Sequence, residues 1–243
     1  MDESYSLERI YPDVLAAGHV SDQKVLDLHL ERYRFAAQHL KGKRVLDMAC
    51  GCGYGSALLA ETEPDLQFVG VDVDASAVAY GQQHYQASNL QFLQHDAMTF
   101  EDTEGFDVIV SLETIEHLVD PKNFVKRFPG LLKPGGRVIA SVPTTPTVDG
   151  NPHHLHDFTR NSFKKMMKEA GFSQDVSFEQ IQKWVMAGLF SGNGDQKPTR
   201  TQEAKNNVMK YYLKKPWALG SRIWSICRYG LANRYLTAVF LKD

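Results

Sequence analysis

The stretch VLDMACGCGYG, residues 45–55, decides the fold predicted for this chain. Its first residues form an apolar run typical of a buried strand, and Gly51, Gly53 and Gly55 then allow a turn whose backbone can lie against a ligand. We expect a helix from about Ser56, whose unpaired N–H groups face that same turn. A glycine-rich turn of this kind suits a dinucleotide, a flavin or a nucleoside.

Acidic residues at three strand ends narrow these choices. Asp47 ends the first strand, Asp72 ends the apolar strand QFVGVD, and Asp96 follows the strand LQFLQ. A carboxylate at the end of the second strand can accept hydrogen bonds from both hydroxyls of a ribose. The pattern therefore indicates a ligand that contains a nucleoside.

The chain resembles the class I S-adenosylmethionine-dependent methyltransferases. Their first motif reads Asp/Glu-x-Gly/Ala-x-Gly-x-Gly, and the matching residues here are Asp47, Ala49, Gly51, Gly53 and Gly55. The resemblance implies that the glycine turn lies along the methionine part of the donor.

The same resemblance implies that Asp72 binds the ribose hydroxyls and that Asp96 receives the adenine amino group. Ser111, at the end of the fourth strand, is assigned to the same donor site. A nicotinamide cofactor is the alternative, but its fold normally spaces the glycines GxGxxG, and residue 56 here is Ser56.

Strand and helix patterns alternate through the middle of the chain, as a doubly wound α/β sheet requires. KPGGRVIASVP, residues 133–143, resembles the strand-five motif of the same family. We expect a Rossmann-like, seven-stranded sheet with a reversed edge hairpin and a helical insertion before the last strand. The expected strands are 44–47, 67–72, 90–94, 106–111, 137–142, 175–179 and 235–241. The expected helices cover 21–40, begin near residues 56, 75 and 121, and cover 161–170.

The length of 243 residues fits one methyltransferase domain, residues 1–243. Within it we expect an N-terminal lead and helix over residues 1–41. The sheet core covers residues 42–180 and 234–243. A helical lid or insertion occupies residues 181–233.

The first expected helix, with Ser21 as its N-cap, places His29, Arg32 and Tyr33 at positions i, i+3 and i+4, on one face. The segment from this helix to the glycine turn resembles methyltransferases of polysaccharide and glycan biosynthesis, in which a His-x-x-Arg-Tyr element precedes the first motif. The shared face either lines the pocket or is a solvated surface.

The stretch FDVIVSLETIEHL places Glu113, Glu116 and His117 directly after the fourth strand. If a helical turn starts there, the three side chains project from one face beside the methyl donor. Two carboxylates and an imidazole in that arrangement can hold a divalent metal and leave positions open for substrate oxygens.

This Glu-x-x-Glu-His pattern resembles that of plant small-RNA 2′-O-methyltransferases and of ubiquinone-pathway O-methyltransferases. The resemblance implies a divalent ion (Mg, Mn, Fe or Zn), with His154 as the fourth ligand and His153 and His156 as close rivals. Two alternatives stay open: His117 acts as a general base or in a polar pocket without metal, or these histidines are structural.

Composition bounds the partners and the compartment. Residues 181–243 hold eleven Lys/Arg against three Asp/Glu, a charge of +8. Since the net charge of the chain is −2, the first 180 residues carry −10. The basic and aromatic residues of 208–230 suit a substrate lid, an amphipathic pair packed on the sheet, or a peripheral membrane contact. Three cysteines with no framework spacing, and the absence of a long apolar run, predict a cytoplasmic protein without a transmembrane segment; Cys50 and Cys52 are expected to pack as small residues.

These observations predict an O-methyltransferase that uses S-adenosyl-L-methionine and acts on a small-molecule or glycan acceptor. His117, Glu113 and Glu116 are the expected catalytic residues. A sugar or nucleotide-linked glycan ranks first as acceptor, a catechol or quinone precursor second, and an RNA 3′ end third, because the acidic core disfavours nucleic acid. A nicotinamide oxidoreductase and a non-catalytic nucleoside-binding protein are the alternatives from other classes. The oligomeric state does not follow from the sequence.

Overall fold

The computed structural model describes residues 10–12, 20–146, 153–183, 211–230 and 232–243. The predictions made for residues 1–9, 13–19 and 184–210, including the loop SGNGDQKPT, and for the start of NPHHLHDFTR lie outside these described residues.

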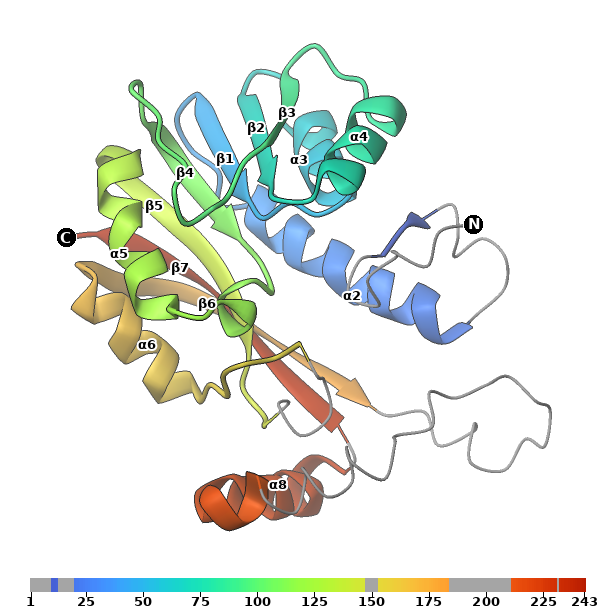
Figure 1. Ribbon diagram of the computed structural model, residues 1–243, viewed down its shortest axis with the longest axis vertical. Helices are drawn as coiled ribbons and strands as arrows, with labels where there is room; N and C mark the ends of the chain where they lie inside the picture. Colours follow the sequence, from blue (N-terminus) through green and yellow to red (C-terminus); the bar gives the residue numbers. More distant parts are fainter. Residues whose placement is uncertain (1–9, 13–19, 147–152, 184–210, 231) are drawn as a thin grey trace.

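One mixed sheet organises the fold (Figure 1). Its seven strands lie in the order β3-β2-β1-β4-β5-β7-β6, and β7 runs antiparallel to both of its neighbours. The predicted α/β fold with a reversed edge hairpin is confirmed. The strands are β1 (Arg44–Met48), β2 (Gln67–Asp72), β3 (Leu90–Gln94), β4 (Phe106–Ser111), β5 (Leu132–Pro143), β6 (Phe172–Lys183) and β7 (Ala232–Lys242).

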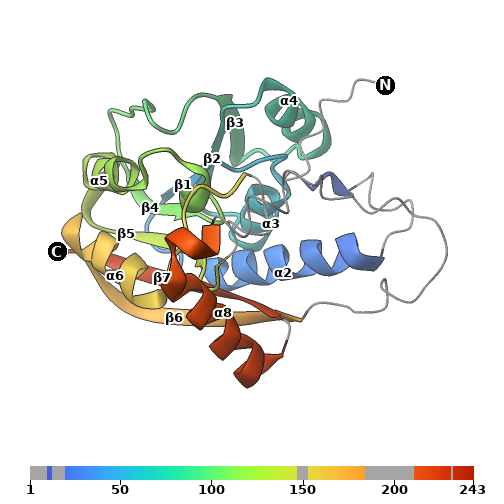
Figure 2. The same cartoon turned by 60° about the horizontal axis from the view of Figure 1, so that its bottom comes forward.

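Helices cover both faces of the sheet, as parallel strands joined by helical crossovers require. Helices α5 and α6 lie on one face, and α2 and α3 on the other (Figures 1 and 2). The helices are α2 (Val20–Ala37), α3 (Tyr54–Thr62), α4 (Ala75–His84), α5 (Pro121–Leu131), α6 (Arg160–Glu169) and α8 (Pro216–Tyr229), with a short 3₁₀ turn η1 (Ile115–His117).

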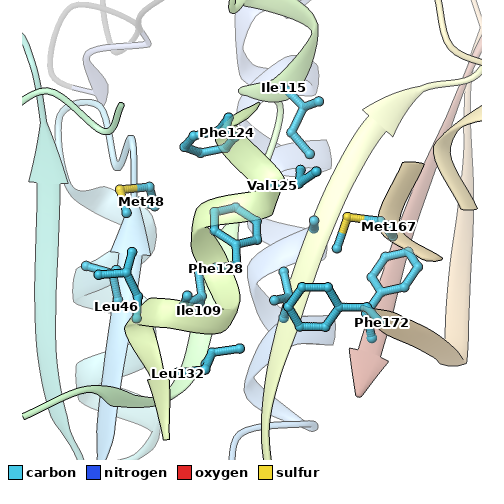
Figure 3. Packing of buried hydrophobic residues seen from close by; sticks show 14 of the residues in the cluster. Leu46, Met48, Ile109, Ile115, Phe124, Val125, Phe128, Leu132, Met167 and Phe172 are labelled. Carbon is cyan, nitrogen blue, oxygen red and sulfur yellow. The ribbon is translucent and has the colours of Figure 1, made fainter. Parts of the chain in front are cut away.

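The larger core cluster fills the space between the sheet and helices α5 and α6. Figure 3 shows Phe124 and Phe128 of α5 pointing toward the strands, where Leu46 and Ile109 meet them; all four side chains are fully buried. Because β1 and β4 are central and covered on both faces, each contains consecutive buried apolar residues, Val45 and Leu46 in β1 and residues 108–110 in β4, which made them recognisable in the sequence.

Several boundaries differ from the prediction. Helix α2 begins at Val20, so Ser21 lies inside it and is not the N-cap. Strand β5 starts at Leu132 rather than at residue 137, because it follows directly on α5 and includes the residues 134–136. The β6–β7 pair is also longer than predicted, because most of the residues that extend the two strands are polar and give no local strand signal.

Among the described residues, no helix combines the length and the hydropathy that crossing a bilayer requires.

Candidate active site

A cavity of about 600 Å³ opens at the carboxyl ends of β1, β2 and β4. Its volume is in the range usual for small-molecule sites, and its place is where ligands bind in open α/β sheets. The loops after β1, β2, β3 and β4 form one side. Residues of α2, of the β6–β7 hairpin and of α8 form the other.

The glycine turn contributes its backbone to this wall at Ala49 and Gly51. Both have a positive φ, 63° and 58°. A Cβ built on Gly51 meets no atom within 4 Å, so the residue faces open space, and its N–H donates to Asp72 Oδ2 at 2.9 Å. The turn therefore leaves a shallow backbone surface that a ligand can approach closely.

The other two glycines of the motif serve packing. A Cβ on Gly53 would lie 2.5 Å from the ring of Phe92, and one on Gly55 would overlap the ring of Tyr33. Neither residue belongs to the cavity wall. Because Gly53 and Gly55 have no side chain, the turn can pack against the sheet and α3 can pack against α2.

The first acidic residue of the motif also lies behind the wall. Asp47 is 1% exposed and accepts hydrogen bonds from Ser56 Oγ at 2.6 Å and from Tyr33 Oη at 3.2 Å. Burial raises its pKa from 3.8 to about 7, against the effect of these two hydrogen bonds, and the nearby Asp72 adds to the rise. Asp47 thus connects α2, β1 and α3 beneath the turn.

The two later strand-end acids do line the cavity. Asp72 is buried at the end of β2, and its Oδ1 accepts the N–H of Asp74 at 3.0 Å. Asp96 follows β3 and accepts the N–H of Met98 at 2.8 Å. Both carboxylates are therefore held by backbone groups, in the places predicted for ribose and adenine contacts.

Ser111 does not join them. Its side chain is fully buried at the end of β4, outside the cavity wall, and its Oγ has no hydrogen-bond partner in the parts of the chain that the structure describes.

Glu113, by contrast, lies on the wall in a strained backbone conformation. Its φ is 52°, a value that few residues other than glycine adopt. Ser141 holds it twice: Ser141 Oγ donates to Glu113 Oε1 at 2.6 Å and accepts the Glu113 N–H at 2.9 Å. Its carboxylate is directed by β5.

The expected single helical turn carrying Glu113, Glu116 and His117 is therefore not formed. The 3₁₀ turn η1 begins only at Ile115, and Glu113, two residues before it, has a left-handed backbone and a carboxylate bound by Ser141. Glu113 remains in the same cavity but outside the cluster described next.

Glu116, His117 and His154 bring one ligand atom each to within 4.8 Å of one another. The Glu116 side chain is fully buried, and the His117 and His154 rings are 4.6 Å apart, edge to face. The backbone makes this meeting possible, because the N–H groups of Leu155 and His156 donate to the Glu116 carbonyl at 2.9 and 3.2 Å.

The structure separates His154 from its rivals. His153 contacts His117 Nδ1 through its carbonyl at 3.2 Å, and of the three histidines 153, 154 and 156 the cavity wall includes His154. Burial lowers the pKa of His154 to about 4, and His117 adds to this effect. A neutral imidazole can act as a metal ligand or as a proton acceptor.

Helix α2 turns its His29, Arg32 and Tyr33 to the cavity, so this face lines the pocket. His29 Nδ1 is hydrogen-bonded to Tyr54 Oη at 2.7 Å, and burial, with Arg32 nearby, lowers the His29 pKa to about 3. The helix packs against α3, which carries Tyr54. This pair fixes one end of the cavity.

Arg32 is the most unusual group on the wall. Its side chain is 2% exposed, its guanidinium stacks on the Tyr235 ring at 4.4 Å, and its Nε lies 3.9 Å from Glu113 Oε1. Neither Nε nor Nη1 has a hydrogen-bond partner among the described residues. A buried guanidinium with unsatisfied donors is costly, so this part of the cavity is suited to an anionic group.

Sequence reasoning missed the residues that close the cavity from the far side. They come from the β6–β7 hairpin and from α8: Gln182, Arg222, Asn233 and Tyr235. Arg222 donates to the carbonyl of Pro146 and to Asn233 Oδ1, which ties α8 to β7. The basic and aromatic composition of this region was the only signal for them, and it could not say which side chain points inward.

Cys50 and Cys52 are buried residues of the turn, they line the cavity, and they form no disulfide with each other. Burial raises the pKa of Cys50 well above its usual value. Neither belongs to the carboxylate–histidine cluster found among the described residues.

Comparison with known proteins agrees with this site. The family of proteins described as "Methyltransferase domain" matches residues 39–210, more than half of the chain. The chain belongs to this methyltransferase family. Its fold is that of the class I S-adenosylmethionine-dependent enzymes, so the family favours the methyl donor over a nicotinamide.

Two relatives show the range of acceptors within the family. Phosphoethanolamine N-methyltransferase 1 of Triticum aestivum is 31% identical over 157 residues, which are 59% of this chain and 31% of that protein. A ubiquinone biosynthesis O-methyltransferase of Acinetobacter baumannii is 33% identical over 118 residues, 46% of this chain and 47% of that protein. The match thus spans less than half of each relative.

Solved structures show the same fold. A protein from Bacillus halodurans superimposes with a TM-score of 0.66 at 18% identity, covering 88% of this chain and 98% of its own. The N-methyltransferase NodS of Bradyrhizobium japonicum, in complex with S-adenosyl-L-homocysteine, gives 0.58 at 15% identity, covering 89% and 86%.

Proposed function

We propose that this protein is an O-methyltransferase that transfers the methyl group of S-adenosylmethionine to a hydroxyl of a sugar or nucleotide-linked glycan. The observation that carries the proposal is the cluster of Glu116, His117 and His154 in the same cavity as Asp72 and Asp96. The two carboxylates and the exposed Gly51 backbone fit a nucleoside donor. The cluster fits an acceptor that must lose a proton.

Two features of the wall fit the donor. The Asp72 carboxylate sits at the end of β2, and the space in front of Gly51 would be filled by any side chain at that position. When bound, S-adenosylmethionine supplies an activated methyl group. The chain aligns donor and acceptor and excludes water, and most of the rate enhancement of such displacements comes from that alignment.

An amine can attack without help once it is neutral, whereas a sugar hydroxyl is a poor nucleophile until its proton is removed or its pKa is lowered. His117 and His154 provide imidazoles for that proton, and the buried Glu116 stands beside them. The proposal therefore has two versions: without a metal, His117 takes the proton as the base, and with a metal, His117 is one of its ligands and the ion activates the hydroxyl.

The donor set fits a first-row transition metal better than magnesium. Two imidazole nitrogens and one carboxylate oxygen form a set typical of Mn, Fe or Zn, while Mg prefers oxygen ligands. Glu116, His117 and His154 would hold the ion, and Glu113 would not be among its ligands. Such an ion supplies positive charge that lowers the pKa of a nearby hydroxyl.

Arg32 supports an anionic group in the same cavity. The carboxylate of the donor and the phosphate of a nucleotide-linked sugar share the chemistry that would satisfy its Nε and Nη1. An uncharged catechol has no anionic group to offer Arg32, which is why the sugar-linked acceptor ranks above a quinone precursor. The variant Arg32→Gln, described in the Discussion, separates the two anions.

The experiment is a metal and turnover assay on the purified chain. We expect Glu116→Gln and His154→Ala to lose Mn or Zn binding, measured by titration calorimetry, and to keep donor affinity within a few-fold. His153→Asn is the matched control, because it changes the neighbouring histidine and keeps the carbonyl that contacts His117.

Turnover is measured on a panel of nucleotide sugars, neutral sugars, catechols and RNA 3′ ends, with and without chelator. Metal binding unchanged by both substitutions contradicts the metal site. If the protein keeps full activity in chelator and the His117→Ala variant loses it, only the version with His117 as a general base and no metal remains. Donor binding without turnover of any acceptor favours a non-catalytic role.

A further inference from the structure

Helix α8 lies outside the two layers that cover the sheet, next to the start of β7 (Figures 1 and 2). It begins with Pro216 at its first turn and ends at Gly230, whose positive φ of 78° stops it. Its packing on the rest of the molecule is narrow. Only Ala218 and Ser225, two turns apart on one line of the helix, are buried.

The opposite side of α8 is apolar, where a surface helix normally carries its polar residues. At 100° per residue, the residues opposite Ala218 cover about half of the circumference, and none of them is charged. Their large side chains are between 39% and 54% exposed. We call these residues the outer face of α8: Trp217, Leu219, Gly220, Ile223, Trp224, Ile226 and Cys227.

The charged residues of α8 and of the segment just before it are all basic. Arg222 and Arg228 flank the outer face, Lys214 and Lys215 precede it, and residues 211–230 contain no Asp or Glu. Lys215 forms an ion pair with Asp157 at 3.4 Å. Lys214 and Arg228 are exposed. A symmetric dimer through this face would bring two like-charged rims together, which is unfavourable.

An anionic bilayer matches both properties. Its head groups attract Lys and Arg, and its interface accepts Trp and aliphatic side chains at the depth reached by a helix lying in the plane. We propose that α8 docks the protein on anionic lipid membranes through its outer face. This inference does not depend on the acceptor or on the metal.

The placement of Arg222 gives the docking a consequence. It lies at the inner edge of the outer face and also lines the cavity. Membrane docking would therefore hold the cavity beside the lipid surface.

The test uses the full chain and two kinds of vesicle: phosphatidylcholine alone, and phosphatidylcholine with phosphatidylglycerol. In sedimentation, we expect at least about tenfold stronger binding to the anionic vesicles and a loss of this preference at high salt. A blue shift of tryptophan fluorescence should accompany binding.

Two pairs of variants separate apolar contact from charge. Ile223→Gln should weaken binding about tenfold, since it removes an exposed apolar side chain without touching the core. Val176→Gln, an exposed apolar residue on β6, is its control. Arg228→Glu should weaken binding to anionic vesicles only, and Lys126→Glu on α5 is its control, with the same change in net charge.

Three results would overturn the inference. The first is equal vesicle binding by Ile223→Gln and Val176→Gln. The second is a dimer in light scattering that Ile223→Gln converts to monomer, which would assign the face to a second copy. The third is no vesicle binding together with slow fluorescence quenching by acrylamide in solution, which would show that the chain covers the face itself.

Discussion

Replacing Asp47 by Asn should change the pH dependence of stability more than any other substitution in the glycine motif. Asp47 is buried beneath the turn, with hydroxyl donors from α3 and α2, and burial raises its pKa to about 7. The unfolded carboxyl has its ordinary pKa of 3.8. The folded protein therefore holds a proton in a range of pH where the unfolded chain has released it.

The sign follows from this difference. Below about pH 4 the Asp47 carboxyl is protonated in both the folded and the unfolded state, so it does not lower the free energy of unfolding. As pH rises toward 7, unfolding releases a proton and the free energy of unfolding falls. A rise of about three pKa units at about 1.4 kcal/mol each gives about 4 kcal/mol lost by pH 8. An amide does not titrate, so Asp47→Asn should escape this loss.

Urea unfolding of both proteins at several pH values between about 4 and 8 measures the effect. Titrations common to both proteins cancel in the difference, which should grow by about 4 kcal/mol in favour of Asp47→Asn. Asp65→Asn, which removes an exposed carboxyl, controls for the loss of one negative charge. A constant difference across this range would show that Asp47 is ionised in the fold at all these values.

The same variant bears on the predicted donor-binding role of Asp47. Because the carboxylate lies behind the cavity wall, calorimetry should find donor affinity changed by no more than a few-fold. A loss of a hundredfold would mean that the side chain reaches the donor.

Three further outcomes follow from the geometry. Gly55→Ala should destabilise the fold by about 1–3 kcal/mol in chemical unfolding, because the added Cβ overlaps the Tyr33 ring. Its control, Gly130→Ala at an open position of α5, should stabilise the fold by about 0.5–1 kcal/mol. Similar effects of both substitutions would contradict the packing role of Gly55. Arg32→Gln should weaken the binding of an anionic acceptor such as a nucleotide sugar about tenfold or more in calorimetry. If the substitution instead weakens the binding of S-adenosylmethionine but not that of methylthioadenosine, Arg32 binds the donor's carboxylate. Asp72→Asn should weaken S-adenosylhomocysteine by about tenfold while the fold persists, and unchanged affinity would remove the ribose assignment.

Strands β2, β3 and β4 match their predicted bounds, because a short strand pattern closed by a turn or an acid is a local signal. Strands β6 and β7 were predicted too short, since their length depends on pairing with each other over ten positions. That pairing joins residues distant in sequence.

The site divides in the same way. The position of Gly51, Asp72 and Asp96 at the ends of strands followed from the sequence alone, because a parallel sheet brings the carboxyl ends of its strands to one edge. Spacing also identified Glu116 and His117 as neighbours.

Only the tertiary structure decided which partners these residues meet. His154 joins Glu116 through backbone bonds from the following residues, Glu113 turns to Ser141 through a positive φ, and Arg32 reaches a ring on β7. Each contact spans from 28 to over 200 residues of sequence, and its geometry is fixed by strand register and helix packing. Local sequence patterns carry no information about distances of that kind, so the chemistry of the acceptor side was decided by the fold.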